Sequence, residues 1–154
     1  MQGDKKVIEY LNKALKHELT AINQFFLHAR MLEDWGLEKY NQKEYEESIE
    51  EMQHADKLIK RILFLDGLPN LQDLGKLLIG ESVREILDND REIELGALEL
   101  YREAVAYCET VQDYATRDLF SQLLAEEEEH LDWLDTEIGL YEALGRENYL
   151  QRWT

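Results

Sequence analysis

The sequence predicts an all-α fold, a four-helix bundle with one long crossover between its second and third helices and a short C-terminal fifth helix. Three observations support this. The 154 residues contain one proline and eight glycines, so few helix breakers interrupt the chain. Apolar residues recur at three- and four-residue spacing in four long segments. One glycine-containing stretch separates the second segment from the third. The length fits a single domain, residues 1–154.

The first two helices are expected at about residues 4–35 and 38–65. Asp4 is the predicted N-cap of the first helix, and Gly36 follows its last turn. An apolar stripe runs along this first helix through Val7, Leu11, Leu15, Leu19, Ile22 and Phe26. These segments therefore read as amphipathic helices that face a common core.

Residues 66–81 form a long connection with three glycines and the only proline. Structureless connections of this length are uncommon in compact domains. One solution is a crossover that travels the length of the bundle, which makes the second and third helices parallel.

The third helix is expected at about 82–111, because Ser82 and Glu85 form a capping-box pattern. The fourth is expected at about 114–144, with Gly145 just past its end. The tail has room for one small helix at about 146–152.

Composition excludes several classes of function. Thirty-four acidic residues against 17 basic ones give a net charge of −17, which disfavours nucleic acid and attracts cations. No apolar run is long enough to span a membrane, and the N-terminus lacks the apolar core of a signal peptide, so a cytoplasmic protein is expected. Cys108 is the only cysteine and is expected to be a small buried hydrophobe.

The candidate metal-binding residues occur in an internal repeat. Glu-x-x-His occurs twice, and 76 positions separate both the glutamates and the histidines of the two copies. A single glutamate precedes each copy by 33 positions, and the same 76 positions separate these two residues. The repeated set is Glu18, Glu51 and His54 in the first half, and Glu94, Glu127 and His130 in the second.

The repeat predicts a site for two divalent cations. Glu and His at i and i+3 share one helix face, and both single glutamates interrupt apolar stripes. Carboxylates that face a bundle core are unfavourable unless they are paired or bind metal. Mixed oxygen and nitrogen ligands suit iron or manganese, and this is the known pattern of the ferritin-like di-iron proteins. The alternative to a metal site is that these Glu/His pairs occur by chance and lie in solvent.

The chain resembles the bacterioferritin family over essentially its whole length. The resemblance is carried by the runs Glu18–Met31 (ELTAINQFFLHARM), Ile62–Gly75 (ILFLDGLPNLQDLG) and Glu127–His130 (EEEH). It implies a ferritin-like bundle whose repeated residues bind two Fe per subunit at a ferroxidase centre. By this resemblance Glu51 and Glu127 bridge the irons, Glu18 and Glu94 each cap one iron, and His54 and His130 complete the two shells.

The resemblance also implies haem b, shared between two subunits through Met52. Taken alone, Met52 reads as a hydrophobe at a subunit contact, because it points about 100° away from Glu51. By the same resemblance, the haem pocket is lined by Leu19, Asn23, Phe26 and Tyr45.

Some positions depart from the family pattern or lie outside it. Phe25 stands where many relatives have tyrosine. Glu46 and Glu50 replace a His/Asp-like pair of the inner surface, and a solvated acidic face explains them equally well. His17 and His28 do not follow the repeat and are expected to be packing or surface residues.

The function implied by the resemblance is iron storage and detoxification. The protein would oxidise Fe²⁺ with O₂ or H₂O₂ and store Fe³⁺ mineral inside a hollow 24-subunit shell built from dimers. A ferredoxin-type reductase would be the partner for iron release. Candidate shell contacts are Trp35, Tyr149 and Trp153.

Two alternatives remain open on the sequence. One is a di-metal redox enzyme that acts on peroxide or an organic substrate and stores no metal, since similar bundles host several chemistries. The other is a structural or haem-binding shell subunit with an idle metal site.

Overall fold

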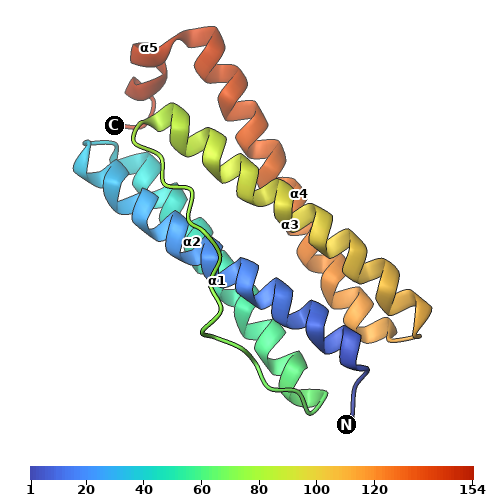
Figure 1. Cartoon of the computed structure of the whole chain (residues 1–154). Helices are drawn as coiled ribbons and strands as arrows, with labels where there is room; N and C mark the ends of the chain where they lie inside the picture. Colours follow the sequence, from blue (N-terminus) through green and yellow to red (C-terminus); the bar gives the residue numbers. More distant parts are fainter.

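The computed structural model describes residues 1–154 and confirms the all-α bundle with a crossover and a short C-terminal helix. Figure 1 shows two helical pairs that lie side by side, with the last helix folded back at one end. No helix combines the length and the apolar character that crossing a membrane requires. The helices are α1 (Lys5–Asp34), α2 (Glu38–Phe64), α3 (Val83–Thr110), α4 (Tyr114–Leu144) and α5 (Arg146–Gln151).

Capping side chains and glycines determine where several helices begin and end. The Asp4 carboxylate accepts hydrogen bonds from the first free N–H groups of α1, and the Ser82 hydroxyl accepts one from Glu85 N–H in α3. Asp113 caps α4 in the same way. Gly36 and Gly145 follow α1 and α4 with φ of 83° and 80°, which glycine adopts without steric cost.

The crossover runs along α1 from one end of the bundle to the other, so that α3 begins near the start of α2 (Figure 1). Polar side chains of α1 hold it at successive turns. Gly75 N–H donates to Thr20 Oγ1, and Leu78 N–H donates to Gln24 Oε1. The predicted parallel arrangement of α2 and α3 follows from this path.

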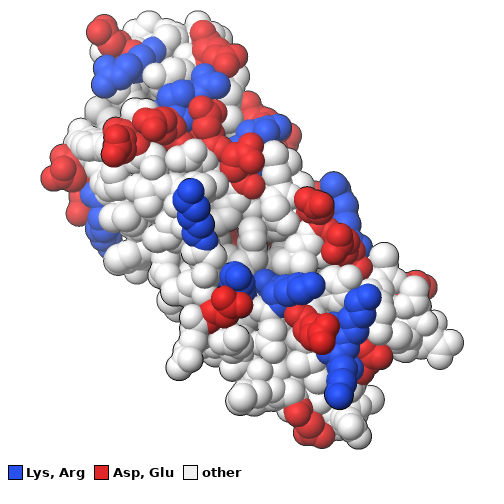
Figure 2. Space-filling model, in the orientation of Figure 1, with Lys and Arg blue, Asp and Glu red and all other residues white.

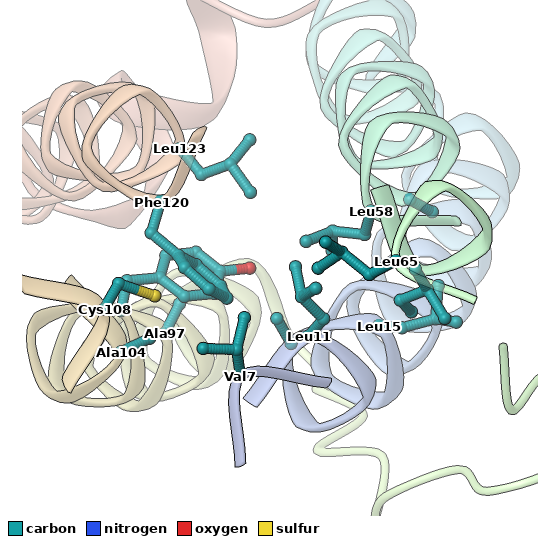
Figure 3. Packing of buried hydrophobic residues seen from close by; sticks show 14 residues of the cluster. Val7, Leu11, Leu15, Leu58, Leu65, Ala97, Ala104, Cys108, Phe120 and Leu123 are labelled. Carbon is teal, nitrogen blue, oxygen red and sulfur yellow. The ribbon is translucent and has the colours of Figure 1, made fainter. Parts of the chain in front are cut away.

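Two apolar clusters occupy the two ends of the bundle. In the larger one, side chains from all four long helices point into one interior, as Figure 3 shows for Leu11, Leu58, Ala104 and Phe120. Cys108 is fully buried there, and burial raises the pKa of its thiol to about 11. The smaller cluster includes Leu32, Val83 and Leu134 and lies at the end that carries α5. Between the clusters lies a band of buried polar residues.

The prediction that Tyr149 forms a shell contact is wrong. Its side chain is fully buried in its own chain, where it packs in the smaller cluster and donates a hydrogen bond to Glu137. Trp153 is half-buried and packs against the same cluster. The tail folds back because α5 follows Gly145, whose positive φ turns the chain at the end of α4. Trp35 remains exposed.

Candidate metal centre

The four long helices each direct repeated residues into the polar band. Glu18 comes from α1 and Glu94 from α3, while α2 and α4 each supply a glutamate and a histidine. All six side chains are buried, and the most accessible, His130, is 5% exposed. Residues that are 33 and 76 positions apart in the sequence are therefore brought to one place in the fold.

One half of the site forms around His54. Its Nδ1 atom lies 3.1 Å from Glu127 Oε1, 3.5 Å from Glu18 Oε2 and 3.7 Å from Glu51 Oε1. These four residues offer ligand atoms that all lie within 4.8 Å of one another. This is a compact donor set for one cation.

The other half forms around His130. Its Nδ1 atom lies 3.4 Å from Glu94 Oε1, and Glu127 completes a second group of ligand atoms within 4.8 Å. Glu127 thus belongs to both groups. The two halves are adjacent, and one carboxylate lies between them.

The site has many buried polar atoms without hydrogen-bond partners. Both oxygens of Glu94 and of Glu127 are unpaired, as are both ring nitrogens of His130. Buried carboxylates without partners are strongly unfavourable, and native structures contain few of them. Divalent cations would satisfy these atoms, so the donor set fits such ions.

In the metal-free site, raised pKa values favour protonation, which offsets part of the negative charge that bound cations would balance. Burial raises the pKa of Glu51 well above its usual range, and the Glu18 and Glu127 carboxylates raise it further. Burial also acts to raise the pKa of Glu18, but hydrogen bonds with Glu51 and His54 outweigh it and leave that pKa lowered. For His54, burial acts to lower the pKa, whereas the nearby Glu127 and Glu18 carboxylates raise it to about 11. His54 is therefore protonated at neutral pH, and the ionised form of Glu51 is disfavoured.

Aromatic residues surround the donors. The Tyr101 hydroxyl donates a hydrogen bond to Glu18, which orients that carboxylate. Phe25 packs edge-on against the His130 ring at 5.4 Å between centroids, and Trp133 stacks on it at 6.1 Å. Phe25 therefore packs against the site but offers no phenol hydroxyl to it.

The structure adds three residues that the repeat did not identify. Glu47 Oε2 lies 3.5 Å from His130 Nδ1, and Glu126 Oε2 lies 2.5 Å from His54 Nε2. The third is Tyr101, which lies on the same face of α3 as Glu94. Glu47 lies one helical turn before Glu51, so helical spacing was a usable signal for it. Glu126 lies within an acidic run in which sequence alone does not distinguish its members.

A third buried group, His28, Glu44 and Asp90, resembles a metal site, but hydrogen bonds within the protein use the ring nitrogens of its histidine. Gly80 N–H donates to His28 Nε2 at 2.9 Å, so the ring proton is on Nδ1. Nδ1 lies 2.9 Å from Asp90 Oδ1 and donates to it. The nitrogen that faces the carboxylates has no free lone pair for a cation. This supports the expectation that His28 is a packing residue.

The other predicted residues lie on the surface. Met52 is 52% exposed, and Phe26 and Tyr45 are exposed with ring centroids 6.2 Å apart. Asn23 is also exposed, whereas Leu19 is half-buried against the larger apolar cluster. His17 is half-buried and packs edge-on near Tyr101.

The chain is similar to known proteins over nearly its whole length. The family model described as ferritin-like domain matches residues 8–144. The chain is 55% identical to a bacterioferritin of Rhodobacter capsulatus over 149 residues, which cover 97% of this chain and 92% of that protein. It is 50% identical to a bacterioferritin of Brucella melitensis over 98% of this chain and 94% of that protein. A Streptomyces coelicolor bacterioferritin is 45% identical, with 97% and 90% covered.

Proposed function

This chain belongs to the bacterioferritin family, within the ferritins, and on that basis we propose that it stores iron and acts as a ferroxidase. Fe²⁺ is its substrate and Fe³⁺ mineral its stored product. The observation that carries the proposal is the paired donor set, in which two Glu/His groups share Glu127 and leave buried oxygens unpaired. A coincidental set of solvated pairs does not explain that burial.

Two Fe²⁺ ions bind side by side in this proposal. Glu18 and His54 hold one ion, and Glu94 and His130 hold the other. Glu51 and Glu127 bridge them, a role that the position of Glu127 in both groups supports.

Adjacent ions allow a two-electron reaction. Each Fe²⁺ gives one electron, so that O₂ with two protons becomes H₂O₂, or H₂O₂ with two protons becomes two water molecules. No one-electron oxygen radical is released. The buried carboxylates favour the higher charge of the Fe³⁺ product. The net charge of −17 attracts Fe²⁺ towards the protein. On the face drawn in Figure 2, acidic and basic side chains are interspersed.

Haem b is proposed to bind between two subunits through Met52 of each. The fit rests on the Met52 thioether, an apolar ligand for haem iron that is largely exposed in the isolated chain. Phe26 and Tyr45 expose aromatic rings that a planar macrocycle can cover. When bound, the haem would supply one-electron transfer for iron release.

We further propose a hollow 24-subunit shell built from dimers, located in the cytoplasm. Large apolar side chains are exposed on the isolated chain, including Leu63, Phe64, Leu68 and Leu71, and exposed apolar surface of this kind marks contact sites. A ferredoxin-type reductase is the proposed partner for iron release.

The test is stepwise anaerobic addition of Fe²⁺ to the metal-free protein, followed by air, with oxidation tracked by absorbance and soluble iron counted per chain. Storage predicts rapid oxidation that continues well beyond two irons per chain, with the iron staying soluble. Oxidation that saturates at two irons would instead indicate a di-metal enzyme acting on peroxide or an organic substrate. A Glu94→Ala variant that oxidises Fe²⁺ at the normal rate would show that the ligand assignment is wrong.

A further inference from the structure

Two hollows open between α2 and α4, and each leads to one histidine of the metal centre. The hollow that reaches His54 has a volume of about 320 Å³ and contains Lys57. The hollow that reaches His130, called here the His130 hollow, has a volume of about 240 Å³. Four carboxylates line it, from Glu47, Glu50, Glu126 and Glu129.

A single basic side chain, Lys43, enters the His130 hollow. Its Nζ atom lies 2.9 Å from Glu47 Oε1 and 4.9 Å from the centroid of the Trp133 ring. An ammonium group is attracted both to a carboxylate and to the face of an indole. Lys43 is therefore held at two points, although about a third of its side chain is exposed.

Glu47 connects this lysine to the metal centre. While its Oε1 atom contacts Lys43, its Oε2 atom lies 3.5 Å from His130 Nδ1 and has no hydrogen-bond partner. A divalent cation that reaches His130 through this hollow meets Glu47 on the way. The ammonium of Lys43 already neutralises that carboxylate.

We propose that Lys43 controls metal entry through the His130 hollow. Its ammonium group pairs with Glu47 until an incoming divalent cation takes the place of the ammonium group at that carboxylate. This inference rests on the proposed metal centre. The His54 hollow has no equivalent, because Lys57 forms no ion pair with the carboxylates around it. The two halves of the centre are accordingly expected to fill at different rates, with the His130 half slower.

The experiment uses Co²⁺, which is not oxidised under these conditions, as a substitute for Fe²⁺. Its association with the metal-free protein is followed by stopped-flow absorbance. Lys43→Met keeps the length of the side chain and its contact with Trp133 but removes the charge. Lys43→Arg keeps the charge. Lys60→Met is the matched control, because Lys60 forms an i,i+4 pair of the same length, 2.9 Å, with Asp56 on the exposed surface of the same helix.

The slower phase of Co²⁺ association should become about three- to tenfold faster in Lys43→Met, the effect of losing one ion pair with a buried partner. Lys43→Arg and Lys60→Met should resemble the wild type. The acceleration should disappear when Lys43→Met is combined with Glu94→Ala, which disables the His130 half. Melting curves would show that each variant is folded.

Equal association rates in Lys43→Met and Lys60→Met would overturn the role of Lys43 and leave the metal centre intact. An acceleration that persists in the Glu94→Ala background would also overturn it, because the effect would then arise from net charge alone. If the wild-type protein binds no Co²⁺ at all, the metal centre itself is wrong and entry control by Lys43 fails with it.

Discussion

The Nδ1 atom of His54 on α2 lies 3.1 Å from Oε1 of Glu127 on α4, and the same glutamate belongs to the group around His130. One carboxylate therefore connects both halves of the candidate centre. Glu94, in contrast, belongs to the His130 half only. Removing Glu127 should therefore affect metal binding in both halves, whereas removing Glu94 should affect only the His130 half.

We expect Glu127→Ala to prevent tight binding of divalent metal in both halves, whereas Glu94→Ala should leave the His54 half able to bind one ion. Isothermal titration of the metal-free proteins with Zn²⁺ gives the number of ions bound per chain. Glu128→Ala is the control, because that neighbouring carboxylate is exposed. Two ions bound to Glu127→Ala would contradict the shared position of this residue.

Tyr101→Phe should destabilise the metal-free protein by about 1–3 kcal/mol, because it removes the hydroxyl that donates to buried Glu18. Urea unfolding at matched protein concentration measures the change in the free energy of unfolding. Tyr107→Phe is the comparison, since that hydroxyl donates to Asp4 at an exposed position and should contribute less. Equal losses in the two variants would mean that Tyr101 does not orient Glu18.

The stability of the metal-free protein should fall as the pH rises above neutrality. The pKa of His54 is raised from 6.5 to about 11, so its stabilising contribution is complete below pH 6.5 and is lost as the pH rises through 11. Glu51, whose pKa is also raised, acts in the same direction because the folded state keeps a proton that the unfolded state releases. The free energy of unfolding should be lower at about pH 10 than at about pH 6.5. In His54→Gln this pH dependence should be shallower, and an unchanged slope would count against the raised pKa.

Glu44→Gln should be tolerated far better than Asp90→Asn. Burial and the nearby Asp90 carboxylate raise the pKa of Glu44 well above its usual range, so the buried site favours an uncharged side chain there, which glutamine supplies. Asp90→Asn removes the charged acceptor of Gln24 and His28 and should cost about 1–3 kcal/mol in the free energy of unfolding. Neither change should alter the number of Zn²⁺ ions bound. A lost ion in either variant would show that the His28 group does bind metal.

Met52→Leu should abolish haem binding while leaving Fe²⁺ oxidation near the wild-type rate, because Met52 points away from the buried donor set and is exposed. The visible absorbance of protein reconstituted with haem reports binding. Met31→Leu, a change at a half-buried methionine on α1, is the control. Retention of the haem spectrum by Met52→Leu would exclude this methionine as the axial ligand.

Local patterns explain why so much of the fold was predictable. Asp4 and Ser82 cap helices through their own side chains, and Gly145 terminates one through its backbone, so neighbouring residues suffice to predict these boundaries. The crossover was predictable from its length and composition. Tyr149 was misjudged because an aromatic residue in a short tail has the same local pattern whether it packs on its own chain or on another.

The sequence by itself determined the fold class and the six side chains of the candidate centre, because helical periodicity and a 76-residue repeat are properties of the chain order. Only the tertiary structure decided which further groups touch them: Glu126 on His54, Tyr101 on Glu18, and Lys43 on Glu47. It also decided that the pKa values of Glu51 and His54 are raised. The physical reason is that contacts between helices, and the burial that shifts a pKa, depend on how helices pack and rotate against one another, which no spacing along one helix specifies.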